Sequence, residues 1–274
     1  MQRARVTAMS VDQPSPSIAE ILDLSGKTAV VTGAGSGLGR AIARRLHEAG
    51  ASVCAVDIDL ASAELTVELL GSRAIAQKAD VRDAAANRAF AQAAVDAFGR
   101  IDIVVPAAGI FFPTFPIMEL PEEEWDRLID INLKGTLLTA QACVPHMTEG
   151  GTIVNIASTS AYRPARNLGH YAASKGGVSL LTKSMALELA PRIRCNAVAP
   201  GSIDTEGGQR TAAAFAATIG AEPADVKKGY ITRNPMQREG VADDIARVVL
   251  FLASPLSSYV TGEIVLADGG ILLT

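Results

Sequence analysis

The chain has 274 residues, of which 49% are hydrophobic and 20% are charged, and its formal net charge is −4. These values exclude a disordered or fibrous protein, and the weak negative charge argues against a basic surface for nucleic acid or anionic lipid. No apolar run approaches the roughly 18 residues of a membrane span. We therefore expect a folded protein that acts on a small molecule, with neither nucleic acid nor membrane as a partner.

The three cysteines are Cys54, Cys143 and Cys195, and each stands in an apolar run. Their odd number and wide spacing favour buried, reduced thiols over a disulfide framework or a zinc site. The expected location is therefore a reducing one, the cytoplasm. Residues 1–22 lack the uninterrupted apolar core of a secretory signal and are interpreted as a flexible tail. The arginines in its first residues leave an organelle transit peptide as the alternative.

Short β-branched runs alternate with longer alanine-rich helical patterns from residue 27 onward. The predicted strands are 28–33, 52–58, 74–81, 101–109, 152–158, 192–201 and 263–270. The predicted helices are 38–50, 61–71, 83–99, 122–149, 169–190 and 241–253. This alternation indicates right-handed βαβ crossovers and a doubly wound parallel sheet of about seven strands with helices on both faces, in a single domain over 23–274. The segment 202–235 is too long for an ordinary connection, so we expect a lid or binding loop there.

A glycine-rich turn, "VVTGAGSGLGRAIA", joins the first predicted strand to the first long helix. Gly33, Gly37 and Gly39 would let the backbone turn tightly and approach a diphosphate at the helix N-terminus. A purely structural turn is the alternative. Asp57 ends the second strand, where a carboxylate can accept hydrogen bonds from the adenosine ribose of NAD and repel the 2′-phosphate of NADP. Asp80 lies at the end of the third predicted strand and is also compatible with a simple turn aspartate.

Tyr171 and Lys175 are four residues apart in "HYAASKGG", which places both on one face of a helix. A tyrosine that acts as a base near neutral pH must lose about three pKa units, or ~4 kcal/mol. A lysine ammonium one turn away in a desolvated site, together with an oxidised nicotinamide ring, can supply this stabilisation. Ser158 ends the fifth predicted strand, and Asn132 is a polar residue on an apolar helix face. Each of these two, considered alone, fits a structural role better than a catalytic one.

These motifs occur together in an order that resembles one family. The landmarks are "TGAGSGLG", Asp57, "ADV", "AAG", "DINLKG", "IVNIAS", "YAASK", "IRCNAVAPGSIDT" and "TGEIVLADGG". From about residue 23 to its end, the chain resembles the single-domain, NAD-dependent branch of the short-chain dehydrogenases/reductases. The resemblance implies a Rossmann-like fold, an oxidoreductase acting on a secondary alcohol or ketone, and a homotetramer or homodimer.

The resemblance also implies roles for individual residues. Tyr171 is the expected acid/base, Ser158 orients the substrate oxygen, Lys175 lowers the tyrosine pKa and holds the nicotinamide ribose, and Asn132 anchors a proton-relaying water. The expected cofactor contacts are Gly33, Ser36, Gly37, Leu38, Gly39, Asp57, Asp80, Val81, Ala108, Gly109, Tyr171, Lys175, Pro200, Gly201, Ile203 and Thr205. NAD is the expected cofactor, with NADP less favoured because neither Ser36 nor Ile58 offers a cation for its phosphate.

One departure from the family pattern follows the fourth strand, where Pro106 and Ala107 stand in place of the usual pair of asparagines. Proline removes a backbone donor, so the cofactor contact there can be weakened. Three rival interpretations remain: a non-catalytic NAD-binding regulator, a nucleotide-sugar epimerase or dehydratase on the same scaffold, and a decayed active site.

The substrate is left open by the sequence. Phe111, Phe112 and Phe115 can wall an apolar pocket, whereas basic residues near the tyrosine and in the lid favour a carboxylate or phosphate if they are not simply solvated. These charged residues are Arg163, Arg166, His170, Arg210, Lys227, Lys228 and Arg233. The three histidines show no metal-ligand spacing, so we expect no catalytic metal.

Overall fold

Seven parallel strands form the central sheet of the computed structural model, which describes residues 16–274. The strands are β1 (Thr28–Thr32), β2 (Ser52–Asp57), β3 (Ala74–Lys78), β4 (Ile101–Pro106), β5 (Met147–Ile156), β6 (Ile193–Pro200) and β9 (Ile264–Ala267), in the spatial order β3-β2-β1-β4-β5-β6-β9. Strands β1 and β4 are buried along their whole length, which explains their continuous apolar sequences. The predicted Rossmann-like α/β sheet is confirmed.

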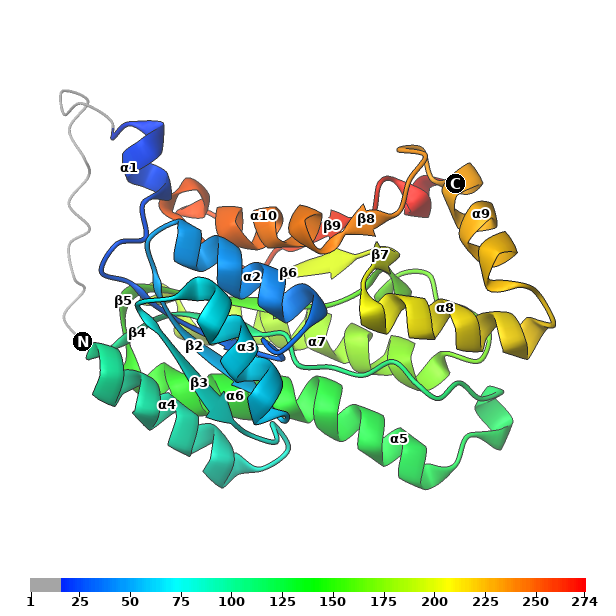
Figure 1. The fold of residues 1–274 in the computed structure, drawn as a ribbon, viewed down its shortest axis with the longest axis horizontal. Helices are drawn as coiled ribbons and strands as arrows, with labels where there is room; N and C mark the ends of the chain where they lie inside the picture. Colours follow the sequence, from blue (N-terminus) through cyan, green and yellow to red (C-terminus); the bar gives the residue numbers. More distant parts are fainter. Residues whose placement is uncertain (1–15) are drawn as a thin grey trace.

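Helices cover both faces of this sheet (Figure 1). One face carries α2 (Gly37–Glu48), α3 (Leu60–Leu70) and α10 (Ala242–Ala253), and the other carries α4 (Ala84–Phe98), α6 (Gly135–Cys143) and α7 (Gly169–Leu189). Alternate residues of β1 enter the two cores: Val31 packs with Ile42 of α2, and Val30 packs with Phe90 of α4. Each strand therefore contributes to two hydrophobic clusters, one on each side.

The predicted helix 122–149 is wrong at its end and is not uniform. It is α5 (Glu122–Ile129), a π-helical turn (Asp130–Lys134), then α6, and a 3₁₀ turn (Val144–His146). Pro145 lies in that last turn, and β5 begins at Met147, which pairs with Ile101. A proline disfavours helical continuation, and pairing with β4 adds sheet hydrogen bonds, so the last three residues of the predicted helix join the sheet.

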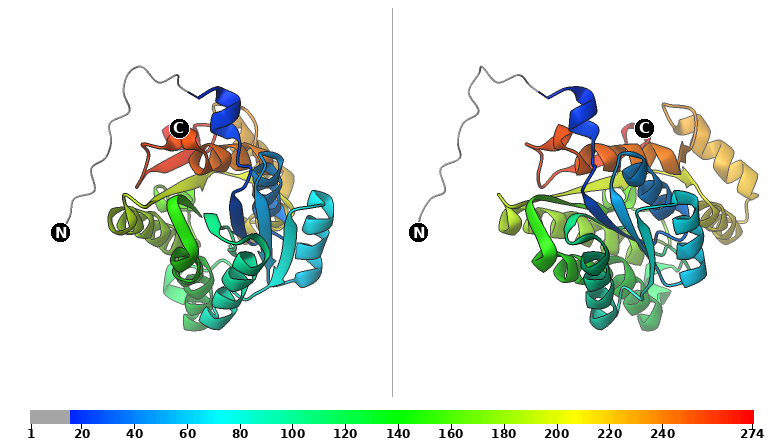
Figure 2. Two further views of the ribbon diagram at one scale, coloured as in Figure 1. Left: turned by 90° about the vertical axis from the view of Figure 1, so that its left-hand side faces the viewer. Right: turned by 60° about the vertical axis from the view of Figure 1, so that its left-hand side comes forward.

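The segment 202–235 contains regular structure. It forms the short strand β7 (Ile203–Asp204), then α8 (Glu206–Ile219) and α9 (Pro223–Arg233), and β7 pairs with β8 (Gly240–Val241). Helices α8 and α9 lie beyond the end of α10 that is remote from the chain's first helix (Figures 1 and 2). Its position after the carboxyl end of β6 makes this segment a neighbour of the sheet edge where the predicted site residues lie.

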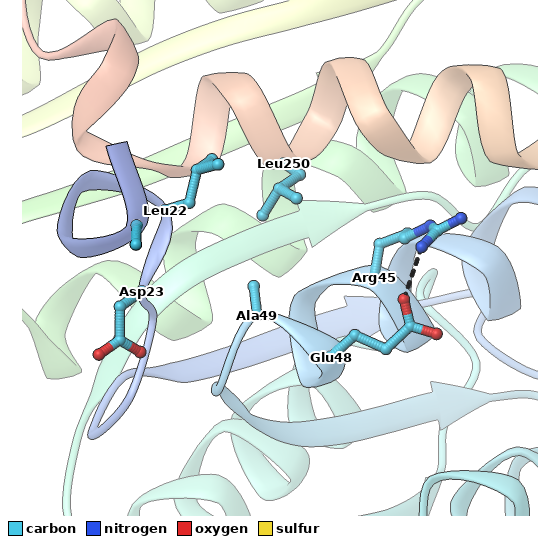
Figure 3. Close-up of a pocket in the computed structure, with 7 residues that line it drawn as sticks. Leu22, Asp23, Arg45, Glu48, Ala49 and Leu250 are labelled. Carbon is cyan, nitrogen blue, oxygen red and sulfur yellow. Dashed lines mark hydrogen bonds and ion pairs between the residues drawn. The ribbon is translucent and has the colours of Figure 1, made fainter. Parts of the chain in front are cut away.

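The predicted flexible tail 1–22 contains a short helix, α1 (Ile18–Leu22), closed by a capping box between Ser17 and Glu20. Residues 1–15 lie outside the described part of the chain. A shallow hollow lies between α1, the end of α2 and α10, where Leu22 and Leu250 approach Ala49 and Arg45 pairs with Glu48 (Figure 3). It is at the amino end of the sheet, since α2 runs antiparallel to the strands, and is therefore remote from the predicted catalytic residues.

Candidate active site

The strand order reverses between β1 and β4, so their carboxyl ends border the crevice where ligands of such sheets bind. Gly33 follows β1 with φ of +66°, and a Cβ placed on it would lie 2.8 Å from Cα of Ala108. The backbone N–H of Ala108 also donates to Oγ1 of Thr32, at 3.2 Å. The two connections are therefore in direct contact, and only glycine fits at position 33.

The glycine-rich turn leads directly into α2. Gly37 has φ of +49°, and a Cβ on Gly39 would lie 2.0 Å from the carbonyl oxygen of Gly33. Ser36 is the N-cap residue, but its side chain makes no capping hydrogen bond. Leu38 packs against the core cluster that contains Ile42. The N-terminus of α2 is thus held close to the crevice, with its positive dipole end suited to a diphosphate.

Asp57 lies at the end of β2, beside this turn. Its Oδ2 accepts from the backbone N–H of Gly35 at 2.9 Å, and Oδ1 accepts from that of Asp59 at 3.1 Å. Arg40, which was not singled out from the sequence, donates from Nε to Oγ1 of Thr66 at 3.1 Å and from Nη2 to the carbonyl of Gly35. The sequence signal that could have identified Arg40 is its position one residue after Gly39, on the first turn of α2. A cation therefore stands at the turn that presents Asp57.

Asp80 and Val81 lie in a turn after β3, which ends at Lys78 rather than at residue 81. Asp80 forms a salt bridge with Arg82 at 2.6 Å, and hydrogen bonds from that arginine hold the pKa of the carboxyl below its usual value. Val81 is buried, with a methyl group against Gly135 of α6. These contacts occupy the Asp80 carboxylate and the Val81 side chain within the protein itself.

Asn132 lies in the π-helical turn between α5 and α6 and is fully buried. Its Oδ1 accepts from the N–H of Ile110 at 2.8 Å, while its Nδ2 donates to the carbonyl of Ile110 at 2.9 Å and to Oγ of Ser174 at 3.2 Å. Extra residues of this kind in a helix often occur at functional sites. The side chain thus joins the segment after β4 to α7.

Helix α7 carries Tyr171 and Lys175 one turn apart, with Nζ 5.9 Å from the centroid of the phenol ring. Nζ donates to the carbonyl of Ile156, the last residue of β5, at 2.8 Å. Gly109 lies between Asn132 and Lys175, since a Cβ placed on it would lie 3.2 Å from Oδ1 of Asn132 and 3.6 Å from Nζ of Lys175. The absence of a side chain at position 109 leaves open the space between these two polar groups.

Ser158 completes the arrangement from a turn after β5, which ends at Ile156 and not at residue 158. Its Oγ accepts from the N–H of Ser160 at 3.1 Å. Burial raises the pKa of the Tyr171 phenol, and a hydrogen bond with Ser158 opposes that change. Burial also lowers the pKa of Lys175 to about 8. Burial therefore dominates the pKa of both side chains, and the lowered phenol pKa expected from the sequence needs the additional positive charge of an oxidised nicotinamide ring.

Pro200 ends β6, and the next residues approach both the glycine turn and α9. The side chain of Thr205 lies nearest to Gly37, with its methyl group 3.8 Å from a Cβ placed there, and its Oγ1 accepts from the N–H of Gly208 at 3.0 Å. Ile203 packs on the core, and its backbone pairs with Gly240. The segment 200–205 thus reaches across the crevice toward α2.

Tyr230 of α9 supports this segment, a role with no motif in the sequence. Its hydroxyl oxygen accepts from the N–H of Ser202 at 3.0 Å and from Nδ2 of Asn234 at 3.3 Å. A Cβ on Gly201 would lie 2.7 Å from that oxygen, so glycine is required for the approach. Asn234 continues the link by donating to the carbonyl of Asp268 at 2.9 Å.

Two of the cations considered for substrate binding are engaged elsewhere. Lys227 pairs with Asp204 at 3.0 Å and with Glu239 at 2.8 Å. Arg163 donates to the backbone carbonyls of Ile271 and Thr274 near the end of the chain. The side chain of Arg210 lies outside the described residues.

The cysteines and possible metal ligands give no further site. All three cysteines are buried and unpaired, as predicted. Over residues 16–274, no group of three histidine, cysteine, aspartate or glutamate side chains is arranged to hold a metal ion. Within the same described range, no helix has the length and apolar character to cross a membrane.

Known proteins resemble this chain over most of its length. The sequence family described as enoyl-(acyl carrier protein) reductase matches residues 33–272. The (3R)-3-hydroxyacyl-CoA dehydrogenase of Mus musculus is 39% identical over 273 residues, which cover 93% of this chain and 100% of that protein. The L-rhamnose 1-dehydrogenase (NAD(P)(+)) of Sphingomonas sp. is 37% identical over 257 residues, which cover 90% of this chain and 97% of that protein.

A solved structure is also similar to this chain over most of its length. The crystal structure of a short-chain dehydrogenase/reductase of the glucose/ribitol dehydrogenase type from Brucella melitensis is 36% identical, with a TM-score of 0.84 over 91% of this chain and 98% of that one. The chain therefore belongs to the short-chain dehydrogenase/reductase family and is an oxidoreductase, as its motifs predicted.

Proposed function

We propose that this oxidoreductase transfers a hydride between NAD and the carbon of a secondary alcohol or ketone, with Tyr171 as the acid/base. The observation that supports this proposal is a chain of contacts near the crevice where the strand order reverses: Asn132 and Lys175 meet at Gly109, Lys175 lies beside Tyr171, and Tyr171 shares a hydrogen bond with Ser158. The chain supplies at that place a proton acceptor, a hydroxyl donor and an ammonium group.

In the direction of alcohol oxidation, the Tyr171 oxygen takes the substrate's hydroxyl proton, the C–H electron pair departs as hydride, and the carbon–oxygen bond becomes a carbonyl. A bound nicotinamide ring supplies the acceptor for that hydride. The Ser158 hydroxyl donates a hydrogen bond to the substrate oxygen and thereby fixes its position beside the phenol. Ketone reduction uses the same groups in reverse.

Lys175 acts on Tyr171 as a nearby positive charge. Because burial raises the phenol pKa, lowering it by the required ~4 kcal/mol needs positive charge close by. The Lys175 ammonium contributes part of this, and the positive charge of oxidised nicotinamide contributes the rest. Asn132 holds Ile110 and Ser174 in place. Its further proposed role is to bind, at the π-helical turn, a water molecule that relays protons.

NAD fits the turn after β1. The diphosphate would lie at Gly33, Ser36, Gly37 and Gly39, with the adenosine ribose on the Asp57 carboxylate. That carboxylate disfavours a 2′-phosphate, which is the reason for proposing NAD rather than NADP. The nicotinamide end would lie toward Gly201, Ile203 and Thr205. The three unpaired thiols support a reducing, cytoplasmic location.

The test is a spectroscopic screen of secondary alcohols with NAD and NADP, following the absorbance of the reduced nicotinamide. We expect Tyr171→Phe to lower turnover about 10²- to 10⁴-fold, the usual contribution of an acid/base, while NAD binding stays within a few-fold. Tyr259→Phe is the matched control, since that tyrosine is fully exposed. Turnover that survives in Tyr171→Phe would remove the tyrosine from its proposed role.

A second candidate function, a regulator that binds NAD without catalysis, is separated by the same screen. Tight NAD binding without any turnover across a broad panel of alcohols and ketones would favour the regulator. Loss of NAD binding itself would point instead to Pro106, which replaces the usual asparagine at the end of β4.

A further inference from the structure

We propose that the substrate presents an apolar ring to Phe111, and that Phe111 is a specificity-determining residue of this enzyme. The inference rests on the proposed function, because it takes the Tyr171 oxygen as the place where the substrate's hydroxyl or carbonyl must lie. It goes further in choosing one chemical class of substrate, apolar cyclic alcohols, over sugars and over carboxylated or phosphorylated compounds.

The ring of Phe111 stands against that of Tyr171. Their centroids are 4.5 Å apart and the ring planes meet at 62°, an edge-on contact. A substrate oxygen within hydrogen-bond distance of the phenol brings the substituents on its carbon close to this phenylalanine. An aromatic face favours apolar groups, and it offers no hydrogen bond to a sugar hydroxyl.

Phe111 is held in place by its neighbours in the segment 110–115. On one side of it, the backbone of Ile110 is fixed by Asn132 through two hydrogen bonds. On the other side, the carbonyl of Phe112 accepts from Arg127, and the ring of Phe112 lies edge-on to that of Phe111, with centroids 5.0 Å apart. Because Phe111 is fixed from both sides, its ring can select a substrate by shape, and no free energy is needed to order this side chain when the substrate binds.

Hydrogen bonds also join the segment 110–115 to the start of α7, the helix that carries Tyr171. His170 precedes Tyr171, is buried, and is bonded through Nε2 to the carbonyl of Pro113 at 3.0 Å. A carbonyl only accepts, so Nε2 carries the hydrogen. The backbone N–H of Phe115 donates to the carbonyl of Asn167 at 3.0 Å. The rings of Phe111 and Phe112 and the phenol of Tyr171 are therefore positioned through the same short segment, residues 167–170.

Two of the cations that the sequence offers for an anionic substrate already have partners in the protein. Lys227 is neutralised by Asp204 and Glu239, and Arg163 binds the carbonyls at the chain's end. A carboxylate or phosphate would have to compete with these existing partners. An apolar ring needs neither of them.

The experiment compares 1-phenylethanol and cyclohexanol with butan-2-ol and myo-inositol as substrates of the full chain with NAD. We expect kcat/KM for the two ring alcohols to exceed that for butan-2-ol at least tenfold, and myo-inositol to be a poor substrate. In Phe111→Ala, kcat/KM for the ring alcohols falls about 10- to 100-fold while that for butan-2-ol stays within about threefold. Phe111→Leu, which keeps apolar bulk, gives intermediate values.

Phe251→Ala is the matched control, because Phe251 lies partly exposed on α10. NAD affinity and the midpoint of thermal unfolding are measured for each variant, so that a folding defect is recognised. If Phe111→Ala does not fold, the comparison of substrates is made with Phe111→Leu. A preference for myo-inositol, or an equal loss for all alcohols in Phe111→Ala, overturns the inference and leaves hydride transfer intact. Absence of Tyr171-dependent turnover with any alcohol or ketone overturns the proposed function, and this inference with it.

Discussion

Burial acts on Lys175 and Tyr171 with the same result, because it favours the neutral form of each. It lowers the pKa of Lys175 to about 8 and raises that of Tyr171. At pH 7 most Lys175 side chains still carry a proton, and Nζ donates to the carbonyl of Ile156. The ammonium is thus retained at pH 7 beside a phenol that holds its own proton firmly. The proposed alcohol oxidation by Tyr171 should become faster as the pH rises from 7 toward 8, and this gain should diminish above pH 8, where Lys175 loses its charge.

The proposed preference for NAD depends on Asp57 and can be tested separately from turnover. We expect Asp57→Ala to weaken NAD binding about tenfold, since two hydrogen bonds to the ribose are lost, and to improve NADP binding relative to NAD. Arg40 at the same turn is the cation available to the 2′-phosphate once the carboxylate is removed. Equilibrium titration of both cofactors measures the ratio. An unchanged ratio would contradict the ribose contact.

Sequence patterns predicted those site residues whose roles depend on local spacing. Tyr171 and Lys175 lie one turn apart on a helix, as their separation of four indicates, and Gly33 has the positive φ that a tight turn requires. Phe111 and Tyr230 could be placed only by tertiary packing. Neither belongs to a periodic pattern, and their partners, Tyr171 and Ser202, are distant in sequence.

At the scale of elements, the Asp102 carboxylate connects three strands at the amino end of the sheet. It lies on β4, accepts from the N–H of Thr28 on β1 at 3.0 Å and from Oγ1 of Thr148 on β5 at 3.2 Å, and is paired with Arg100. Burial alone would raise the pKa of Asp102, but hydrogen bonds from Arg100 and Thr28 outweigh it and hold the pKa below its usual value. The ionised form is therefore the one that stabilises the sheet.

We expect Asp102→Asn to lower the free energy of unfolding by about 2 kcal/mol at pH 7, because the amide offers a donor where the carboxylate accepts. A carboxyl with a depressed folded-state pKa contributes its full stability above about pH 4 and loses it as the pH falls further. The difference between wild type and variant should therefore be constant at neutral pH and shrink in acid. Urea unfolding across this range measures it, with Asp96→Asn on α4 as the control. A difference that grows in acid would contradict the assignment.

The accuracy of element prediction followed the range of the interactions involved. The seven strands were predictable because β-branched runs and turn residues are local signals. The π-helical turn at Asn132 was not, since its geometry depends on hydrogen bonds to Ile110 and Ser174 from other parts of the chain. The strand start at Met147 likewise depends on its pairing with Ile101.

At the scale of the whole molecule, α7 leaves apolar side chains on its outer face. Leu180 and Leu187 are 68% and 84% exposed, and their spacing of seven places them on one side of the helix. Large apolar residues so exposed on a helix are a feature of surfaces that associate. The family resemblance implies a homotetramer or homodimer built through this helix and the predicted helix 122–149, which the structure divides into α5, α6 and short turns. We propose that assembly here.

We expect Leu187→Glu to shift the protein toward smaller assemblies, because an unpaired carboxylate buried between two copies of α7 costs several kcal/mol. Leu69→Glu is the matched control: Leu69 is 75% exposed on α3, a helix outside the proposed interface. Light scattering coupled to size-exclusion chromatography gives the mass of each variant at micromolar concentration. A wild type that is already monomeric, or a Leu187→Glu variant with the same mass as wild type, would contradict assembly through α7. Since Tyr171 and Lys175 lie on this same helix, dissociation should also lower turnover, which links the oligomer to the site.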